Sequence, residues 1–280
     1  MFDAGCRYET QSLQRARGSL VATFRVRDGV SVLDTLHQSG CLKARFPRPT
    51  GQGWTELVTV NSSGGIAAGD RLSTRIAAAP GVRVTVSGQA AERFYRARPS
   101  DGPAEIANRI DAAAGAAVEW LPQETIVYDG AAVSRRLEVD LAAGASFLGV
   151  EMLVFGRALM GECVRRLWLR DRLAVGRNGR RLLYDAIRIG GDAASLLARA
   201  GIAGGMSAVA TIVYVAGDAE ARLAGVREAF RETDAEAGAS AEDGLMVARV
   251  LAPSGAALRH AAAAALFVLR GRPLPRVWLC

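Results

Sequence analysis

The sequence predicts a mainly β fold, with stacked antiparallel β-sheets in a solenoid-like arrangement and two α-helices in the C-terminal third. Three observations predict it. Segments rich in β-branched and aromatic residues recur along most of the chain. A weak internal repeat places a glycine turn between apolar stretches. Only near the C-terminus does the apolar period become that of a helix.

The first strands are expected between residues 18 and 60. Residues 20–26 read Leu-Val-Ala-Thr-Phe-Arg-Val, a composition typical of strands. A second strand, 56–60, follows a turn at 47–53 that is rich in proline and glycine. We expect residues 1–17 to form a flexible N-terminal segment and the whole chain, 1–280, to form one domain.

A weak internal repeat follows, with expected glycine turns at Gly81, Gly115 and Gly144. In each copy an aliphatic residue stands five places before the glycine, and an apolar strand follows. A glycine in the left-handed region would let the chain fold back between strands. Recurrence at this spacing favours stacked strand layers, as in a β-solenoid or an elongated sandwich. The alternative is a chance similarity in a chain rich in alanine and glycine.

The remaining elements are predicted in order from local signals. Asn178-Gly179 is a hairpin signal between two strands. Asp218 is a candidate N-cap for the first helix, and Gly271 followed by Pro273 ends the second. The predicted strands are 137–141, 145–155, 163–172, 180–189, 206–215 and 244–251, and the predicted helices are 219–235 and 256–270.

The chain has 280 residues and a formal net charge of +7. Such a balance is typical of proteins that bind nucleic acid, a membrane surface or an acidic protein. The arginines are scattered, and the densest groups, at 165–172 and 177–181, are interrupted as on strand faces. This favours an acidic protein partner over nucleic acid. No signal peptide or apolar membrane run is recognisable, which predicts a cytoplasmic protein without membrane contact.

The glycine-rich stretch 61–70, Asn-Ser-Ser-Gly-Gly-Ile-Ala-Ala-Gly-Asp, superficially resembles a phosphate loop. A Walker loop requires lysine and then serine or threonine directly after its last glycine. Here Gly69 is followed by Asp70, whose carboxylate would repel a phosphate. The spacing of Gly64, Gly65 and Gly69 also differs from that of a dinucleotide-binding loop. We therefore expect a tight turn between two strands.

Residues that usually carry catalysis or tight metal binding are scarce. The only histidines are His37 and His260. Cys41 lies four residues after His37, but in a strand or turn their side chains need not meet to form a catalytic pair. No close group of histidine, cysteine and acidic residues predicts a metal cage. Isolated carboxylates do occur in apolar or small-residue stretches: Asp70, Glu92, Glu124, Asp129, Glu151, Glu162 and Asp185. Each is either exposed or buried against a partner such as arginine.

Six blocks, in order, resemble the urease accessory protein UreD family. They are residues 36–47, 61–70, 89–96, 121–131, 155–162 and 274–278. Each block alone is weakly specific, but together they are highly specific. Ala68 departs from the family pattern, which often has a second glycine there, and the ending Leu279-Cys280 is less typical. The residues that match the family motifs are Gly64, Gly65, Gly69, Asp70, Gln89, Arg93, Tyr95, Pro122, Gln123, Glu124, Gly156, Arg157, Gly161 and Glu162.

The resemblance implies an all-β, solenoid-like fold with two helices and a non-catalytic scaffold in urease maturation. It implies protein partners, namely UreF, the GTPase UreG and apo-urease, and the delivery of Ni²⁺ to the urease active site. Nucleotide hydrolysis would then belong to a partner. No stably bound cofactor is expected, because Ni²⁺ would be bound only transiently.

A metal ion that must enter and leave needs weak ligands, such as carboxylates, carbonyls and water, rather than a cage of histidine or cysteine. On the strength of the resemblance we take five acids as candidates for a Ni²⁺ path: Asp70, Glu92, Glu124, Glu151 and Glu162. Two other readings stay open. One is a basic β-protein that binds nucleic acid, and the other is an enzyme with a hidden site at the Ser-Gly-Gly loop.

Overall fold

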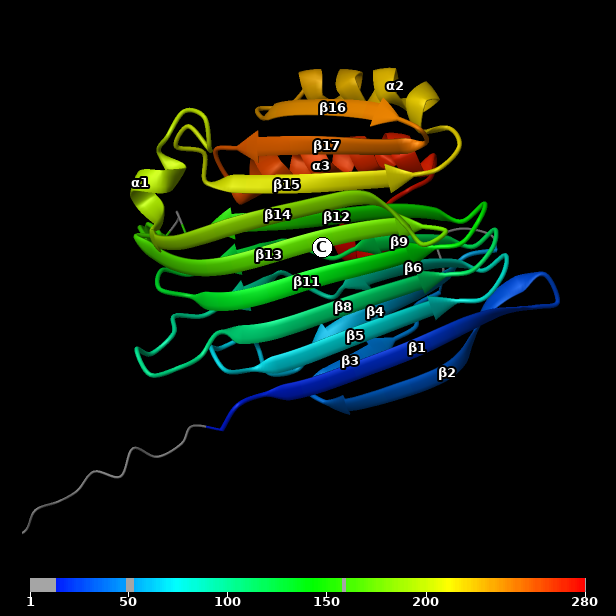
Figure 1. Cartoon of the computed structure of the whole chain (residues 1–280), viewed down its shortest axis with the longest axis horizontal. Helices are drawn as coiled ribbons and strands as arrows, with labels where there is room; N and C mark the ends of the chain where they lie inside the picture. Colours follow the sequence, from blue (N-terminus) through cyan, green and yellow to red (C-terminus); the bar gives the residue numbers. More distant parts are fainter. Residues whose placement is uncertain (1–13, 49–52, 158–159, 280) are drawn as a thin grey trace, which may run out of the picture.

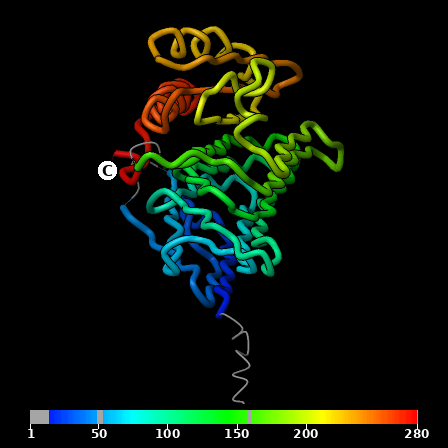
Figure 2. Tube along the Cα trace, turned by 90° about the vertical axis from the view of Figure 1, so that its left-hand side faces the viewer, coloured from blue at the N-terminus to red at the C-terminus, as the bar shows by residue number. Residues whose placement is uncertain are grey.

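The computed structural model describes residues 14–48, 53–157 and 160–279. The prediction of a mainly β protein is confirmed. The chain forms a seven-stranded sheet, a ten-stranded sheet and a pair of helices packed on one end of the second sheet (Figures 1 and 2). The expected flexible segment 1–17 lies mostly outside the described residues, and Arg17 already begins the first strand.

The seven-stranded sheet faces the viewer in Figure 1. Its order is β14-β13-β11-β8-β5-β1-β2. The strands are β1 Arg17–Arg27, β2 Val30–Gly40, β5 Arg71–Ala78, β8 Ala104–Ala112, β11 Ala132–Leu141, β13 Arg166–Arg177 and β14 Arg180–Asp192.

The ten-stranded sheet lies behind it, with the main order β16-β17-β15-β12-β9-β6-β4-β3, and with β10 paired to β12 and β7. Its strands are β3 Leu42–Arg45, β4 Thr55–Asn61, β6 Arg83–Gly88, β7 Glu92–Phe94, β9 Ala117–Leu121, β10 Thr125–Val127, β12 Ser146–Phe155, β15 Ala208–Val215, β16 Glu236–Glu242 and β17 Leu245–Ala252.

The expectation of antiparallel sheets is wrong for the centre of the molecule. Strands β1, β5, β8, β11 and β13 pair in parallel, as do β4, β6, β9 and β12. The cause is the path of the chain, which passes from one sheet to the other after most strands. Successive strands of one sheet therefore run in the same direction, and antiparallel pairs remain at the ends. The sheets do not close on one another, and the solenoid-like arrangement is not confirmed.

The glycine repeat marks the turns by which the chain crosses between the sheets. Gly81, Gly115 and Gly144 have φ of 72°, 67° and 69°, and each follows a strand of the seven-stranded sheet and precedes one of the ten-stranded sheet. The turns also stack, because the N–H of Gly81 donates to the carbonyl of Ala114 (3.1 Å) and that of Gly115 to the carbonyl of Ala143 (3.3 Å). The predicted left-handed glycine turns are thus confirmed, and the repeat is structural rather than accidental.

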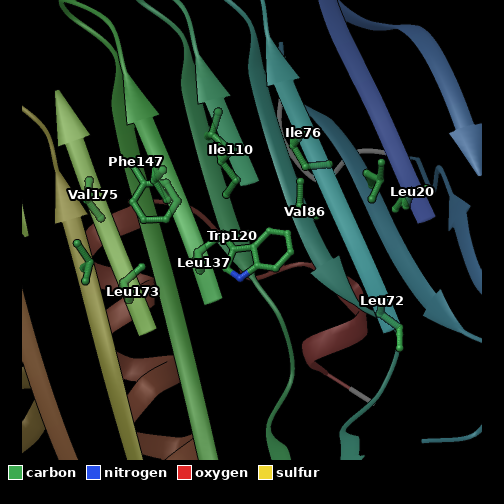
Figure 3. Close-up of a cluster of buried hydrophobic side chains, with 14 of the residues drawn as sticks. Leu20, Leu72, Ile76, Val86, Ile110, Trp120, Leu137, Phe147, Leu173 and Val175 are labelled. Carbon is green, nitrogen blue, oxygen red and sulfur yellow. The ribbon is translucent and has the colours of Figure 1, made fainter. Parts of the chain in front are cut away.

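Two apolar cores lie on opposite faces of the ten-stranded sheet. The first fills the space between the sheets, where Ile76, Ile110, Leu137 and Phe147 meet (Figure 3). The second lies between β12, β15, β17 and the helices. Alternation along β12 serves both cores, since Phe147 and Leu153 face the first and Leu148, Val150 and Met152 face the second.

Both predicted helices are present, as α2 Ala219–Arg231 and α3 Gly255–Arg270. A third, α1 Ala193–Leu197, was not predicted. Gly271 ends α3 in the left-handed region, at φ 60°, as expected. Asp218 does not cap α2 with its side chain; its carboxylate instead accepts from the Tyr214 hydroxyl and the Arg222 guanidinium. None of the described helices combines the length and apolarity needed to cross a lipid bilayer.

Candidate functional site

A cavity of about 220 Å³ opens between the two sheets, at the end where the motif-bearing loops gather. Strands of both sheets contribute to its wall, among them β4, β5, β8, β9, β11 and β12. Of the residues that match the family motifs, those lining the cavity are Gly64, Gly65, Gln89, Arg93, Pro122 and Gln123. Blocks far apart in the sequence therefore meet around one space.

Glu92 is the acid at the outer part of this cavity. It begins the short strand β7, and its Oε2 accepts a hydrogen bond from the Asn61 side-chain amide at 3.0 Å. Burial raises the pKa of the Glu92 carboxyl, although the Asn61 and Arg93 hydrogen bonds oppose the shift. Glu92 is thus a desolvated carboxylate whose charged neighbours are Arg93 and Arg135, and neither of them forms a direct ion pair with it in the described part of the chain.

Replacement of Glu92 by glutamine should make the protein more stable at neutral pH. The raised pKa means that the folded state binds the proton more tightly than the unfolded state, whose ordinary value is 4.5. The stability that this carboxyl contributes is therefore present below that value and lost as the pH rises through the raised pKa. Urea unfolding at about pH 4, 6 and 8 should show Glu92→Gln and wild type converging at the acid end. A difference independent of pH would contradict this.

Deeper in the cavity, Arg135 holds two acids together. Its guanidinium pairs with both carboxylate oxygens of Asp171, reaches Oε2 of Glu151 at 2.7 Å and donates to the Thr125 hydroxyl at 3.1 Å. Oε1 of Glu151 accepts from the Trp120 indole N–H at 2.9 Å. All are held by rigid strands, and Glu151 occupies an inward position on β12.

The charges of this cluster depend on one another. Burial raises the pKa of Glu151, and the Arg135 charge counteracts the shift only in part. Burial alone would lower the pKa of Arg135, but the charges of Asp171 and Glu151 raise it above its ordinary value. Arg135 therefore stays protonated. The cavity is lined by two acids, Glu92 and Glu151, and by two arginines, Arg93 and Arg135. Because Asp171 pairs with Arg135 from outside the cavity wall, it offsets part of the positive charge beside Glu151.

Beyond Glu151, further polar side chains lie on β14, β15 and β17. A smaller cavity of about 20 Å³ shares Glu151 with the first and is also lined by Asp171, Asp185 and Thr211. Asp185 pairs with Arg249, which also donates to the Thr211 hydroxyl. Acidic side chains thus occur in both cavities: Glu92 and Glu151 in the first, and Glu151, Asp171 and Asp185 in the second.

Backbone N–H groups of the glycine-rich loop donate hydrogen bonds to other groups of the same chain. The N–H of Ser63 donates to the Asn61 side chain (3.1 Å), that of Ile66 to the Arg93 carbonyl (2.7 Å) and that of Ala67 to the Asp70 carboxylate (2.8 Å). These groups are not aimed at an empty anion site, which agrees with the expected tight turn.

Gly65 admits no side chain where the loop meets Tyr95. Its φ is 145°, and a Cβ there would lie 2.3 Å from the Tyr95 ring. Gly64, with φ 78°, faces open space and provides a matched control. We expect Gly65→Ala to lower the free energy of unfolding by about 1–3 kcal/mol more than Gly64→Ala, since both are strained but only one overpacks. Equal losses in urea titrations of the two variants would show that the Tyr95 contact is unimportant.

Only Glu92 and Glu151, of the five path candidates, line the cavity. Asp70 is buried and caps its own loop, accepting from the N–H groups of Ala16 and Ala67 at 2.8 Å each. Glu124 pairs with Arg259 at 2.9 Å. Glu162 pairs with Arg157 at 2.7 Å. Asp70, Glu124 and Glu162 therefore have structural partners outside the cavity.

Other motif residues build the rim of the site. The Tyr95 hydroxyl donates to the Gly64 carbonyl (2.6 Å), and its ring packs edge-on against Tyr128. Arg157 lies over the Tyr128 ring at 4.2 Å. The Gln123 side chain donates to the carbonyl of Val277 at 2.6 Å, which ties the C-terminal block to the β9–β10 loop. These contacts fix the loops that bound the cavity.

Arg135 and Asp171 were not predicted. The signal for Arg135 is its place in β11, where it shares the inward side with Val133, Leu137 and Val139. A charged residue in such a register requires a buried partner. His37 and His260 are exposed, and in the described part of the chain no three histidine, cysteine or acidic residues are grouped to hold a metal.

Comparisons with known proteins agree with the motif blocks. The pattern of the UreD urease accessory protein family matches residues 16–279. The chain is 45% identical to "Urease accessory protein UreD" of Xanthobacter autotrophicus, over 95% of this chain and 90% of that protein. It is 44% identical to "Urease accessory protein UreD 3" of a Bradyrhizobium species and to the UreD protein of a Methylobacterium species, covering 95% of this chain and 94% and 95% of theirs. The chain belongs to the UreD urease accessory protein family.

Proposed function

We propose that this chain is a non-catalytic scaffold for urease maturation, acting as a single domain in the cytoplasm. Together with UreF and the GTPase UreG it binds apo-urease and helps to deliver Ni²⁺ to the active site. Membership of the family supports the role in urease maturation. The observation that carries the finer proposal is the acid-lined interior between the sheets.

The chemistry of that interior suits passage better than storage. Carboxylates and amide oxygens bind Ni²⁺ weakly, whereas groups of imidazole or thiolate ligands hold it. Glu92, Asn61 and Glu151 line the cavity, and Asp185 lies further along. The carboxylates attract a divalent cation, and the buried Arg135 keeps Glu151 from binding it too tightly. Asp70, Glu124 and Glu162 act in this proposal as supports of the fold.

Co-purification tests the scaffold role. The tagged chain, expressed with UreF, UreG and apo-urease from the same host, should retain all three proteins. The chain alone should bind no guanine or adenine nucleotide in equilibrium dialysis. Retention of none of the three proteins, or nucleotide turnover by the isolated chain, would refute the proposal.

A further inference from the structure

The outer face of the seven-stranded sheet has two halves with different charge patterns. Over β5, β8 and β11, arginines are matched by acids. Arg71 lies 3.6 Å from Glu105, Arg75 3.0 Å from Asp111, and Arg109 2.6 Å from Asp140. This half is close to neutral, and its charges are already paired.

Over β13 and β14 the same face carries arginines without acids. Together with two aromatic rings they form what we call the arginine patch: Arg170, Arg172, Arg181, Arg188, Trp168 and Tyr184. Its four arginines are exposed and make no ion pair with any described residue. Leu169 and Leu173, which alternate with them on β13, are buried in the core, so the patch lies on the outer side of the sheet. Strands β13 and β14 are at the front of the molecule in Figure 1.

The register brings like charges together. Arg170 lies directly opposite Arg188 across the antiparallel pair β13–β14, and Arg172 lies beside Arg136 across β11–β13. Like charges in directly opposed positions destabilise a sheet. The isolated fold gains nothing from this arrangement, whereas a bound anionic surface would relieve the repulsion.

The aromatic rings add the second property of a docking surface. The Arg170 guanidinium lies 4.9 Å from the Trp168 ring centre, and that of Arg181 lies 5.4 Å from the Tyr184 ring centre. Tyr184 is 55% exposed although it is a large aromatic residue. Arginine, tryptophan and tyrosine dominate the binding energy of protein interfaces, and stacking holds the guanidinium groups in place before a partner arrives.

We infer that the arginine patch is the docking surface for an acidic face of a protein partner in urease maturation, an inference that rests on the proposed function. A depression of about 390 Å³ adjoins the patch, with Arg172, Arg181 and Tyr184 on one side and Glu138 and Asp140 on the other. Acidic side chains of that partner would enter it on the arginine side.

Nucleic acid fits the surface less well. The patch covers two strands, roughly 10 Å across at ~5 Å per strand. Acidic residues lie on both sides of the patch. Glu138 and Asp140 are on β11, and Glu242 and Asp243 line the groove beyond β14. A phosphate backbone running past the patch would meet these carboxylates. One face of each aromatic ring is already covered by a guanidinium, which limits base stacking.

Charge reversal on the two halves of the same sheet face tests the inference. The tagged chain is expressed with UreF, UreG and apo-urease as wild type, as R170E/R188E and as the control R71E/R75E, which changes the net charge equally. We expect the patch variant to capture at least one partner about tenfold less than the control. Capture by wild type should weaken with added salt, and R170K/R188K, which preserves the charge, should retain it.

The outcomes are distinguishable. If wild type captures partners and R170E/R188E captures each as well as R71E/R75E does, the patch is not the docking surface. If wild type captures none, the proposed function fails as well. Preferential loss of binding to a random 20-base-pair DNA duplex, with partner capture unchanged, would overturn the inference in favour of nucleic acid. Unfolding midpoints identify a misfolded variant, and R170Q/R188Q, which adds no negative charge, then replaces it with the same expected direction.

Discussion

Replacement of Arg135 by alanine should lower the free energy of unfolding by about 4 kcal/mol, the typical cost of leaving a buried ion pair half-complete. Arg135 is buried and contacts Asp171, Glu151 and Thr125. Without it, two carboxylates would stay in a low-dielectric interior with no cation. They would take up protons instead, so the loss should be smaller in acid than at neutral pH.

Urea unfolding of the purified variant measures this loss, and Arg136→Ala is the matched control. Arg136 is the next residue of the same strand but is exposed on the outer face. Its removal should change stability little, because surface charges contribute little. A loss for Arg135→Ala no larger than that for Arg136→Ala would mean that the buried cluster does not organise the interior.

The double variant Glu92→Gln, Glu151→Gln should lower urease activation about tenfold, which corresponds to about 1.4 kcal/mol on the limiting step. Both amides preserve the shape of the side chain and one of its two acceptor oxygens, but they remove the negative charge that attracts Ni²⁺ into the cavity. Asp171 still neutralises Arg135, so the fold should persist. Urease activity in extracts, at equal levels of all four proteins, provides the measurement.

Glu162→Gln is the control for that experiment. It makes the same chemical change in an acid that belongs to a family motif but pairs with Arg157 outside the cavity. We expect it to leave activation near the wild-type level. Equal urease activation by the double variant and wild type would show that Glu92 and Glu151 are not part of a Ni²⁺ path. If Glu162→Gln lowered activation as much as the double variant does, the loss would reflect a general disturbance of assembly.

Local signals account for the parts of the fold that the sequence predicts well. The left-handed turns at Gly81 and Gly115 and the C-cap at Gly271 depend on a few adjacent residues. Strand direction depends on where the chain goes next, and this is not visible in a window of ten residues. The parallel centre of both sheets was therefore mispredicted as antiparallel.

Some residues of the candidate site are recognisable from the sequence, and others only from the fold. Glu92 and Glu151 could be identified because each is a lone acid in an apolar or small-residue stretch, and both line the cavity. Asp70 has the same appearance in the sequence but caps its own loop. Arg259 is far from Glu124 in the chain, and Arg135 from Asp171, so only the fold reveals these pairs.

The central claim is that the chain passes Ni²⁺ onward without keeping it. The most direct test measures nickel by mass spectrometry in two samples: the isolated chain after incubation with Ni²⁺ and desalting, and urease matured with or without the chain. We expect little nickel on the chain and nickel-loaded urease only when the chain is present. Stoichiometric nickel retained by the isolated chain, or equal loading of urease without it, would contradict the account.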